Sequence, residues 1–169
     1  FSSPRRLNHA PGQYLEWTLG HAHPDSRGNR RYFTIASSPT EHHVQIGVKL
    51  YDHASSFKKA LLTMHTGDAI MAAQLAGDFV LPKDKNQPCV FIAGGIGITP
   101  FRSMIKYMLD THEQRSVTLF YSTKTAEEIV YRGMFDLAQY ELGLRVIYTL
   151  TDIAHVPAGW SGSVGVIDA

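Results

Sequence analysis

The hydrophobic pattern in the first half of the chain is typical of β-strands separated by turns. Alternation is clearest over residues 44–50, where Val44, Ile46, Val48 and Leu50 are apolar and the residues between them are polar or glycine. A period of two places these side chains on one face of a strand, so we expect an antiparallel sheet with one face in water. Aromatic and β-branched residues or bounding turns predict further strands over 13–19, 31–38 and 68–74.

A short helix is predicted in the same half of the chain. Ser55 and Ser56 carry hydroxyls that can cap its first turn. The i, i+3, i+4, i+7 spacing of a single buried face is followed by Phe57, Ala60, Leu61 and Met64.

The pattern changes after a polar linker at residues 82–87. The continuous apolar run Val90–Ala93 is typical of a parallel strand buried on both faces, and it leads directly into a glycine-rich turn. Helices are then predicted over 100–112 and 126–141, and strands over 117–121 and 144–150. This β-α-β-α-β order predicts a parallel sheet.

Two domains fit this change of pattern. The chain has 169 residues, of which 44% are hydrophobic, enough to bury a sizeable core. We therefore expect an antiparallel β domain over residues 1–84 and a doubly wound α/β domain over residues 85–169.

Composition narrows the range of functions. With 16 basic and 15 acidic residues the formal charge is +1, which gives no bulk field to recruit a nucleic acid or an anionic membrane. The single cysteine, Cys89, rules out an internal disulfide or a four-thiolate cluster held by this chain alone. It suits a reducing compartment, so we expect a cytoplasmic location. No apolar run approaches the roughly 18 to 20 residues that span a bilayer.

The turn from Gly94 to Pro100 is the strongest candidate for binding chemistry. It stands where the first parallel strand becomes a helix, so its free N–H groups and the positive end of the helix dipole would face an anion such as a pyrophosphate. Pro100 suits the first helical position and Thr99 can cap the helix. The alternative is a tight turn that binds nothing, but a strand before and a helix after favour nucleotide binding.

The end of the second predicted strand indicates which nucleotide is bound. An acidic residue that would hold a ribose 2′-hydroxyl is missing there, and the chain instead carries Ser122 and Lys124. A hydroxyl and an ammonium can hold a 2′-phosphate, which favours NADPH. The alternative is a solvated loop.

Several of these segments together resemble one family. Arg31–Pro39 resembles the Arg-x-Tyr-Ser/Thr flavin motif of ferredoxin-NADP reductase-like proteins, and Gly94–Pro100 resembles their NAD(P) loop. Pro11–Tyr14 and Gly77–Phe79 also match. The resemblance implies an antiparallel β-barrel that binds flavin, followed by a Rossmann-like NAD(P)-binding domain. Compared with that family the chain lacks both ends, so we expect a fragment.

The resemblance also implies roles for individual residues. Arg31 would pair with the flavin pyrophosphate, Phe33 would lie against the isoalloxazine ring, and Thr34 would bond near the flavin N5 as the residue closest to the chemistry. Phe33 replaces the commoner tyrosine, and His53 and Ala54 replace glycines that often precede the helix serine. The candidate cofactor-binding residues are Arg31, Tyr32, Phe33, Thr34, Ser37, Val48, Lys49, Ser55, Ser56, Gly94, Gly95, Gly97, Thr99, Pro100, Ser122 and Lys124. No metal site is expected, because the histidines at 21, 23, 42 and 43 lack carboxylate or thiolate neighbours at ligand spacing.

Together these features predict a flavoprotein reductase. It would pass hydride from NADPH or NADH to a bound FAD, or alternatively FMN, and electrons onward to a protein or small carrier that the sequence does not identify. The alternative hypothesis is a non-catalytic nucleotide-binding or electron-transfer module of a larger redox protein. In that case a fused or partner membrane domain would place it at the cytoplasmic face of a membrane.

Overall fold

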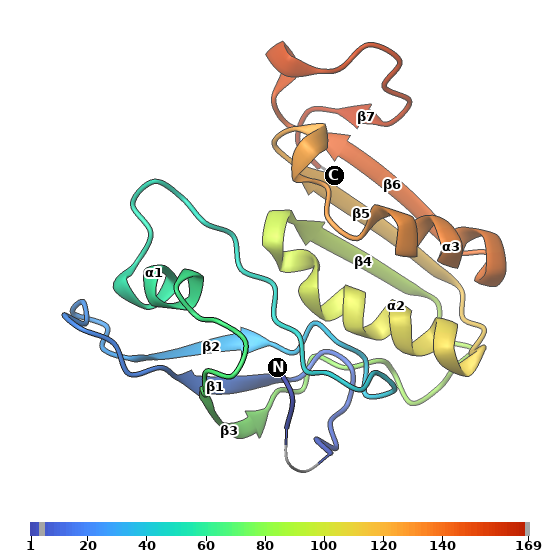
Figure 1. Cartoon of the computed structure of the whole chain (residues 1–169). Coiled ribbons are helices and arrows are strands. Elements are labelled where there is room, and N and C mark those ends of the chain that lie inside the picture. Colours follow the sequence, from blue (N-terminus) through green and yellow to red (C-terminus); the bar gives the residue numbers. More distant parts are fainter. Residues whose placement is uncertain (4–5, 168–169) are drawn as a thin grey trace.

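Two β-sheets, each packed against helices, make up the protein (Figure 1). The computed structural model describes residues 1–3 and 6–167. The first sheet is antiparallel with the strand order β2-β1-β3. Its strands are β1 (Tyr14–Thr18), β2 (Arg30–Thr34) and β3 (Met71–Ala76), and the short helix α1 (Ser56–Leu62) lies over it.

The antiparallel sheet and α1 form the first lobe, and the parallel sheet with its helices forms the second. Alternation along β1 builds the core of the first lobe. Leu15 and Trp17 point to one side, where they pack with Ile35 and with Phe57 of α1. Glu16 points to the other side and is also buried. A hydroxyl and a charged side chain pair with its carboxylate, which offsets the cost of burying the charge. The apolar face of α1 is therefore what holds this helix on the sheet.

The second sheet is parallel with the strand order β4-β5-β6-β7. Its strands are β4 (Cys89–Gly94), β5 (Val117–Thr123), β6 (Arg145–Leu150) and β7 (Ser163–Val164). Between them lie the helices α2 (Thr99–Thr111) and α3 (Arg132–Leu142) and three 3₁₀ turns, η1 (Gly95–Ile98), η2 (Ala126–Glu128) and η3 (Ile153–His155). The β-α-β-α-β order is the predicted one. An antiparallel sheet followed by a parallel α/β sheet confirms the fold class in its coarse form.

Both α2 and α3 cover the same face of the parallel sheet (Figure 1). In β4 the side chains of Phe91 and Ala93 point into that core, whereas Val90 and Ile92 are 65% and 61% exposed on the other face. The prediction that this strand is buried on both faces was therefore wrong. Within the described residues no helix packs on the second face, so alternate side chains remain in contact with solvent.

Residues 44–50 do not form the predicted strand. The N–H of Val44 donates to Phe1 and the N–H of Ala36 donates to Gln45, but the described chain places no ladder of such bonds along residues 46–50. A strand needs a neighbouring segment to pair with, and period-two hydrophobicity does not supply one. The apolar residues of this segment still contribute to packing, because Val44 and Ile46 lie against the core of the first lobe.

The predicted helix over residues 126–141 is interrupted. The chain forms η2, turns at Tyr131 with a φ of 62°, and only then begins α3 at Arg132. Ile129 and Tyr131 pack against the second core through this turn. Tertiary packing of the two side chains therefore outweighs the helical propensity of the segment.

The structure also bears on the predicted barrel, on the predicted domain boundary and on membrane-spanning helices. The described strand pairings leave the first sheet open, so barrel closure is not seen. The predicted boundary at residues 84–85 lies in the segment between β3 and β4, and residues 168–169 of the predicted second domain lie outside the described residues. None of the described helices combines the length and the hydropathy needed to cross a membrane.

Candidate functional site

The glycine-rich turn is a 3₁₀ turn that runs directly into α2. Gly94 ends β4 in an extended conformation, and η1 then turns the chain toward the helix. The first amides of a helical segment have no acceptor within it, so the N–H groups of Gly95, Ile96 and Gly97 are donors at the positive end of the combined helical run. Such a terminus favours an anionic ligand.

The turn also has room for a ligand. A Cβ atom placed on Gly94, Gly95 or Gly97 would meet no heavy atom of the described residues within 4 Å, leaving aside the adjacent residues of the chain. Gly95 has a φ of 49°, in the left-handed region that favours glycine. The backbone at this turn is thus open to close approach, as a pyrophosphate requires.

Thr99 does not cap α2 in the predicted way. Ile98 is the residue before the helix, and its φ and ψ are already helical because η1 merges with α2. Thr99 and Pro100 occupy the first two helical positions, and the Thr99 hydroxyl donates to the carbonyl of Ile96 at 3.3 Å. The hydroxyl therefore stabilises the turn from within.

Ser122 and Lys124 lie at the same edge of the parallel sheet as the glycine-rich turn. Ser122 is opposite Gly94 in the register of β4 and β5, and Lys124 follows at the exposed end of β5. The backbone N–H of Lys124 donates to the Glu128 carboxylate at 3.2 Å, and its carbonyl accepts from the N–H of Asp152. Sequence reasoning missed these two acidic residues, because they reach this edge from later segments.

The flavin motif of β2 is divided between two faces of the strand. Arg31 and Phe33 point toward α1, where the Phe33 ring lies 5.9 Å from that of Phe57. Tyr32 and Thr34 line a cavity of 340 Å³ on the other face. The structure thus brings Arg31 to the serines of α1 but separates Thr34 from them.

The Arg31 guanidinium is held by several acceptors. It donates to Asp25 at 2.9 Å and to three backbone carbonyls of residues 27–30, and it lies 5.3 Å from the centre of the Phe57 ring. Its Nε atom is buried and has no hydrogen-bond partner among the described residues. An unpaired buried donor is costly, so this site has unused capacity for a polar or anionic group.

Asp25 connects Arg31 to the first turn of α1. Its backbone N–H donates to the Ser56 hydroxyl at 2.9 Å, and His21 Nε2 is 2.9 Å from the same hydroxyl. Burial acts to raise the pKa of Asp25, but hydrogen bonds from the Arg27 backbone and the Arg31 guanidinium lower it. An ionised Asp25 therefore orients the guanidinium, which sequence reasoning did not anticipate.

Ser55 takes the capping role predicted for it. Its hydroxyl accepts from the N–H of Lys58 at 3.3 Å, at the start of α1. Ser55 and Ser56 thus both have partners within the protein, one in the helix and one in the loop before β2. Their predicted role in cofactor binding stays a prediction.

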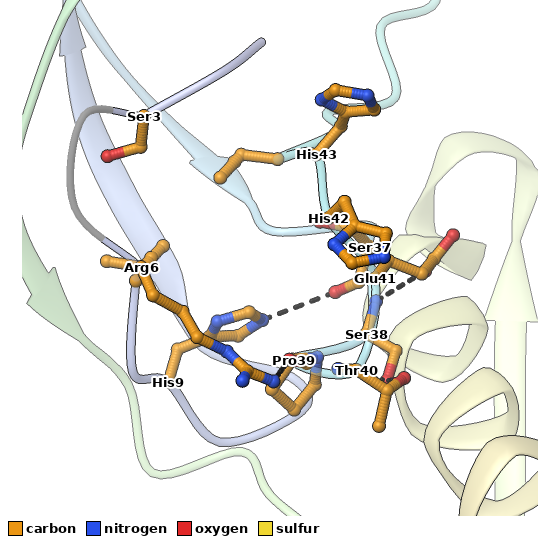
Figure 2. A pocket seen from close by; sticks show the side chains of 12 residues that line it. Ser3, Arg6, His9, Ser37, Ser38, Pro39, Thr40, Glu41, His42 and His43 are labelled. Carbon is orange, nitrogen blue, oxygen red and sulfur yellow. Dashed lines mark hydrogen bonds between the residues drawn. The ribbon is translucent and has the colours of Figure 1, made fainter.

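Ser37 is buried in the loop that follows β2. Its hydroxyl accepts from the N–H of Gln45 at 3.0 Å, and its carbonyl lies 3.3 Å from Nε2 of His9. It lines a cavity of 270 Å³ together with Arg6 and Glu41 (Figure 2). These contacts are structural, and its predicted cofactor contact stays a prediction.

The predicted flavin and nucleotide residues approach each other at residues 47–49. A Cβ on Gly47 would lie 2.6 Å from Cγ2 of Thr99, so any other residue here would force one of the two segments or the Thr99 side chain to shift. Lys49 Nζ is 2.7 Å from the carboxylate of Glu128 in η2, and this ammonium lowers the pKa of that carboxyl. Val48 lies between the two contacts. The glycine-rich turn and the segment that leads to α1 are therefore packed together.

We predict that two glycines of the turn respond differently to alanine. Gly95→Ala should lower the free energy of unfolding by about 1 to 2 kcal/mol, because a Cβ is disfavoured at positive φ. Gly97→Ala should be neutral or stabilising by up to about 1 kcal/mol, since it restricts the unfolded chain and meets open space. Urea unfolding of both variants measures this. Equal losses would show that the turn has another conformation.

Comparison with known proteins identifies an NAD-binding family over the second half of the chain. Residues 91–169 match the family model described as the oxidoreductase NAD-binding domain. NADH-cytochrome b5 reductase 1 of Mortierella alpina is 28% identical over 143 residues, which cover 83% of this chain and 47% of that protein. Across the curated relatives that were compared, the chain spans between 30% and 47% of their length.

Solved structures extend the likeness to the first lobe. The Amycolatopsis cytochrome P450 reductase superposes with a TM-score of 0.78 and 25% identity, over 96% of this chain and 48% of that one. The ferredoxin-NADP⁺ reductase of Plasmodium falciparum has the same fold, with a TM-score of 0.73 and 20% identity over 88% of this chain and 64% of that one. The second lobe therefore matches an oxidoreductase NAD-binding family, and the two lobes together have the fold of the cytochrome P450 reductase and ferredoxin-NADP⁺ reductase structures.

Proposed function

We propose that the protein containing this chain is an NAD(P)H-dependent flavin reductase that passes electrons to a protein or small carrier. The observation that carries this proposal is the contact of the predicted flavin lobe with the second lobe, where Gly47 packs against the glycine-rich turn and Lys49 pairs with Glu128 of η2. Two cofactors must lie side by side to exchange hydride, and this packing brings their predicted binding elements together. The names of the relatives, among them a cytochrome b5 reductase and a cytochrome P450 reductase, support the same class of reaction.

The first lobe would hold the flavin, which we propose to be FAD with FMN as the alternative. When bound, a flavin accepts hydride from a dihydronicotinamide and releases electrons to an acceptor. Arg31 has a buried Nε donor that no described residue satisfies, which suits an anionic phosphate group. Thr34 offers a hydroxyl beside the 340 Å³ cavity. We also propose that this lobe closes into a barrel in the complete protein.

The second lobe would hold the nicotinamide dinucleotide at the carboxyl end of its parallel strands. The N–H groups of Gly95 and Gly97 suit the pyrophosphate, and the space around both residues admits it. Ser122 and Lys124 would contact the adenosine ribose or its 2′-phosphate. No side-chain acid or base is needed, because the protein's task is to orient the two cofactors.

The full-length protein provides the test of this proposal. Purified protein should be yellow, and anaerobic addition of NADPH or NADH should bleach the flavin absorbance. A colourless protein that still binds dinucleotide would instead support a non-catalytic nucleotide-binding module. Absorbance spectra and calorimetric titration of the dinucleotide distinguish the two results.

The flavin site should depend on Arg31. Charge-assisted bonds to phosphate contribute about 1.5 to 3 kcal/mol, so Arg31→Ala should weaken flavin binding by about ten- to hundredfold. Arg27→Ala is the matched control, because Arg27 also pairs with Asp25 but is 65% exposed. Flavin released on denaturation measures occupancy. If the Arg31 variant keeps the flavin content of the Arg27 variant, Arg31 does not bind the cofactor.

Lys124 should set the choice between the two dinucleotides. A contact of its ammonium with the 2′-phosphate, reduced by exposure, should favour NADPH by about tenfold at modest salt. Lys124→Ala should therefore lower kcat/KM for NADPH and change that for NADH little. Asp152→Asn should act in the opposite direction, because it removes a negative charge beside this lysine. A wild-type preference for NADH, or equal losses with both dinucleotides, would make Lys124 a solvated loop residue.

A further inference from the structure

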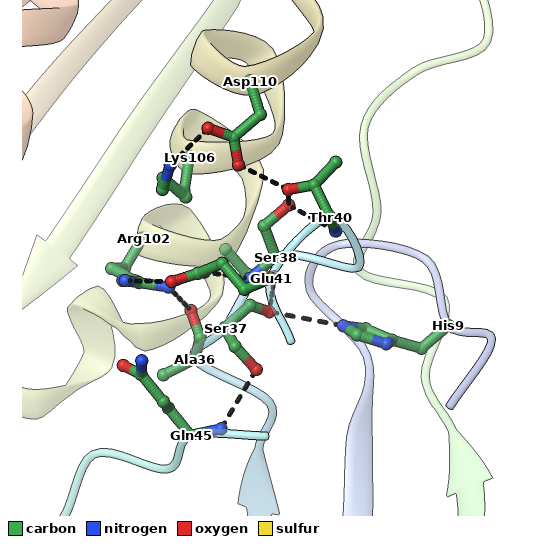
Figure 3. A network of polar contacts seen from close by, with 11 residues as sticks. His9, Ala36, Ser37, Ser38, Thr40, Glu41, Gln45, Arg102, Lys106 and Asp110 are labelled. Atoms are coloured by element: carbon green, nitrogen blue, oxygen red, sulfur yellow. Dashed lines mark hydrogen bonds and ion pairs between the residues drawn. The ribbon is translucent and has the colours of Figure 1, made fainter. Parts of the chain in front are cut away.

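A largely buried ion pair between Arg102 and Glu41 joins the two lobes (Figure 3). Arg102 is in the first turn of α2, and Glu41 is in the loop that follows β2. The two Nη atoms of Arg102 bond the two carboxylate oxygens of Glu41, one of them at 2.9 Å. Arg102 also donates to the carbonyl of Ala36 at 3.0 Å.

The surroundings of this pair leave it little freedom. The side chains of Arg102 and Glu41 are 10% and 18% exposed, and the guanidinium lies 5.6 Å from the centre of the Tyr131 ring. The N–H of Ser38 donates to the same carboxylate at 2.7 Å, and the hydroxyl of Ser103 donates to the Ser37 carbonyl at 2.7 Å. Each partner is therefore held within its own lobe while it bonds the other.

We propose that Arg102 and Glu41 are positioning residues that set the angle and distance between the glycine-rich turn and the flavin motif of β2. This inference rests on the proposed function and deepens it. Arg102 is in the same helical run as Gly97, so a movement of α2 relative to the first lobe also moves the amides of the glycine-rich turn. Glu41 lies in the loop that directly continues Thr34.

The geometry of the pair explains why orientation is its main contribution. A fork of two parallel bonds fixes the relative direction of two planar groups, which a single point contact does not do. The cost of removing these charges from water offsets much of their attraction, so such a pair adds little net stability compared with apolar packing. The core of the second lobe holds α2 independently of this pair, through Phe101, Met104, Ile105 and Met108.

A more exposed contact on the same helix provides a matched control. Lys106 pairs with Asp110, which also accepts from the hydroxyl of Thr40 in the first lobe. Lys106 and Asp110 are both in α2, so their ion pair does not cross between the lobes, and it lies nearer the surface, where solvent screens charges. Lys106→Gln should therefore leave the arrangement of the lobes unchanged.

The experiment compares Arg102→Lys, Glu41→Gln and Lys106→Gln in the full-length protein. One arm measures the limiting rate of flavin reduction at saturating NAD(P)H, normalised to bound flavin, together with the dissociation constant of the dinucleotide. A second arm needs no turnover. It uses pulsed electron paramagnetic resonance between labels at Leu62→Cys and Tyr140→Cys, which are 64% and 89% exposed in the wild type, with Cys89→Ala as background.

Positioning residues should produce a specific pattern. In Arg102→Lys the label distance should shift or broaden and the limiting reduction rate should fall about tenfold, since small misplacements of reacting atoms slow transfer strongly. Flavin content and the dinucleotide dissociation constant should change less than about twofold. Glu41→Gln should act in the same direction even if Arg102→Lys folds poorly, and Lys106→Gln should match the wild type.

Other results would overturn this inference or the proposed function separately. A lower melting temperature with an unchanged label distance and rate would show that the pair is only structural, which overturns the inference. Wild-type flavin that NAD(P)H does not reduce would overturn the proposed function. The label distances would then still decide whether the pair orients the lobes.

Discussion

Close packing at Gly47 is the constraint on which the arrangement of the two lobes depends. A side chain there would lie 2.6 Å from Thr99, 3.1 Å from Ile96 and 3.2 Å from the hydroxyl of Tyr131, all at or beside the glycine-rich turn. The absence of a Cβ lets the backbone of the first lobe lie directly against the turn. Every proposed relation between the two cofactors requires this approach.

Helix α2 combines three tasks through its amphipathic sequence. Its apolar face packs on the parallel sheet, its preceding 3₁₀ turn presents free amides, and Arg102 reaches across to the first lobe. Because a helix is stiff, a contact on one of its faces is transmitted to its end. The same element therefore stabilises the second lobe and orients its predicted binding turn.

Individual ion pairs orient the cationic side chains of this protein, although its overall charge is close to zero. The formal charge of +1 provides no steering field, but Arg31, Lys49 and Arg102 are each held by one carboxylate, on Asp25, Glu128 and Glu41. Paired charges keep their side chains oriented when they are partly buried. An anionic ligand at Arg31 would thus meet a guanidinium that is already directed by the protein.

The sequence by itself determined the order and type of most elements and the position of the glycine-rich turn. Hydrophobic periodicity and turn residues act over a few neighbouring positions, so β1, α1, β4, α2 and β5 could be read from them. The family resemblance supplied candidate residues for both lobes. Tertiary structure alone decided that residues 44–50 form no strand, that the predicted helix is interrupted at Tyr131, and that Asp25, Glu41 and Glu128 hold the cationic side chains. These outcomes depend on partners distant in sequence, and a local pattern contains no information about which segments meet.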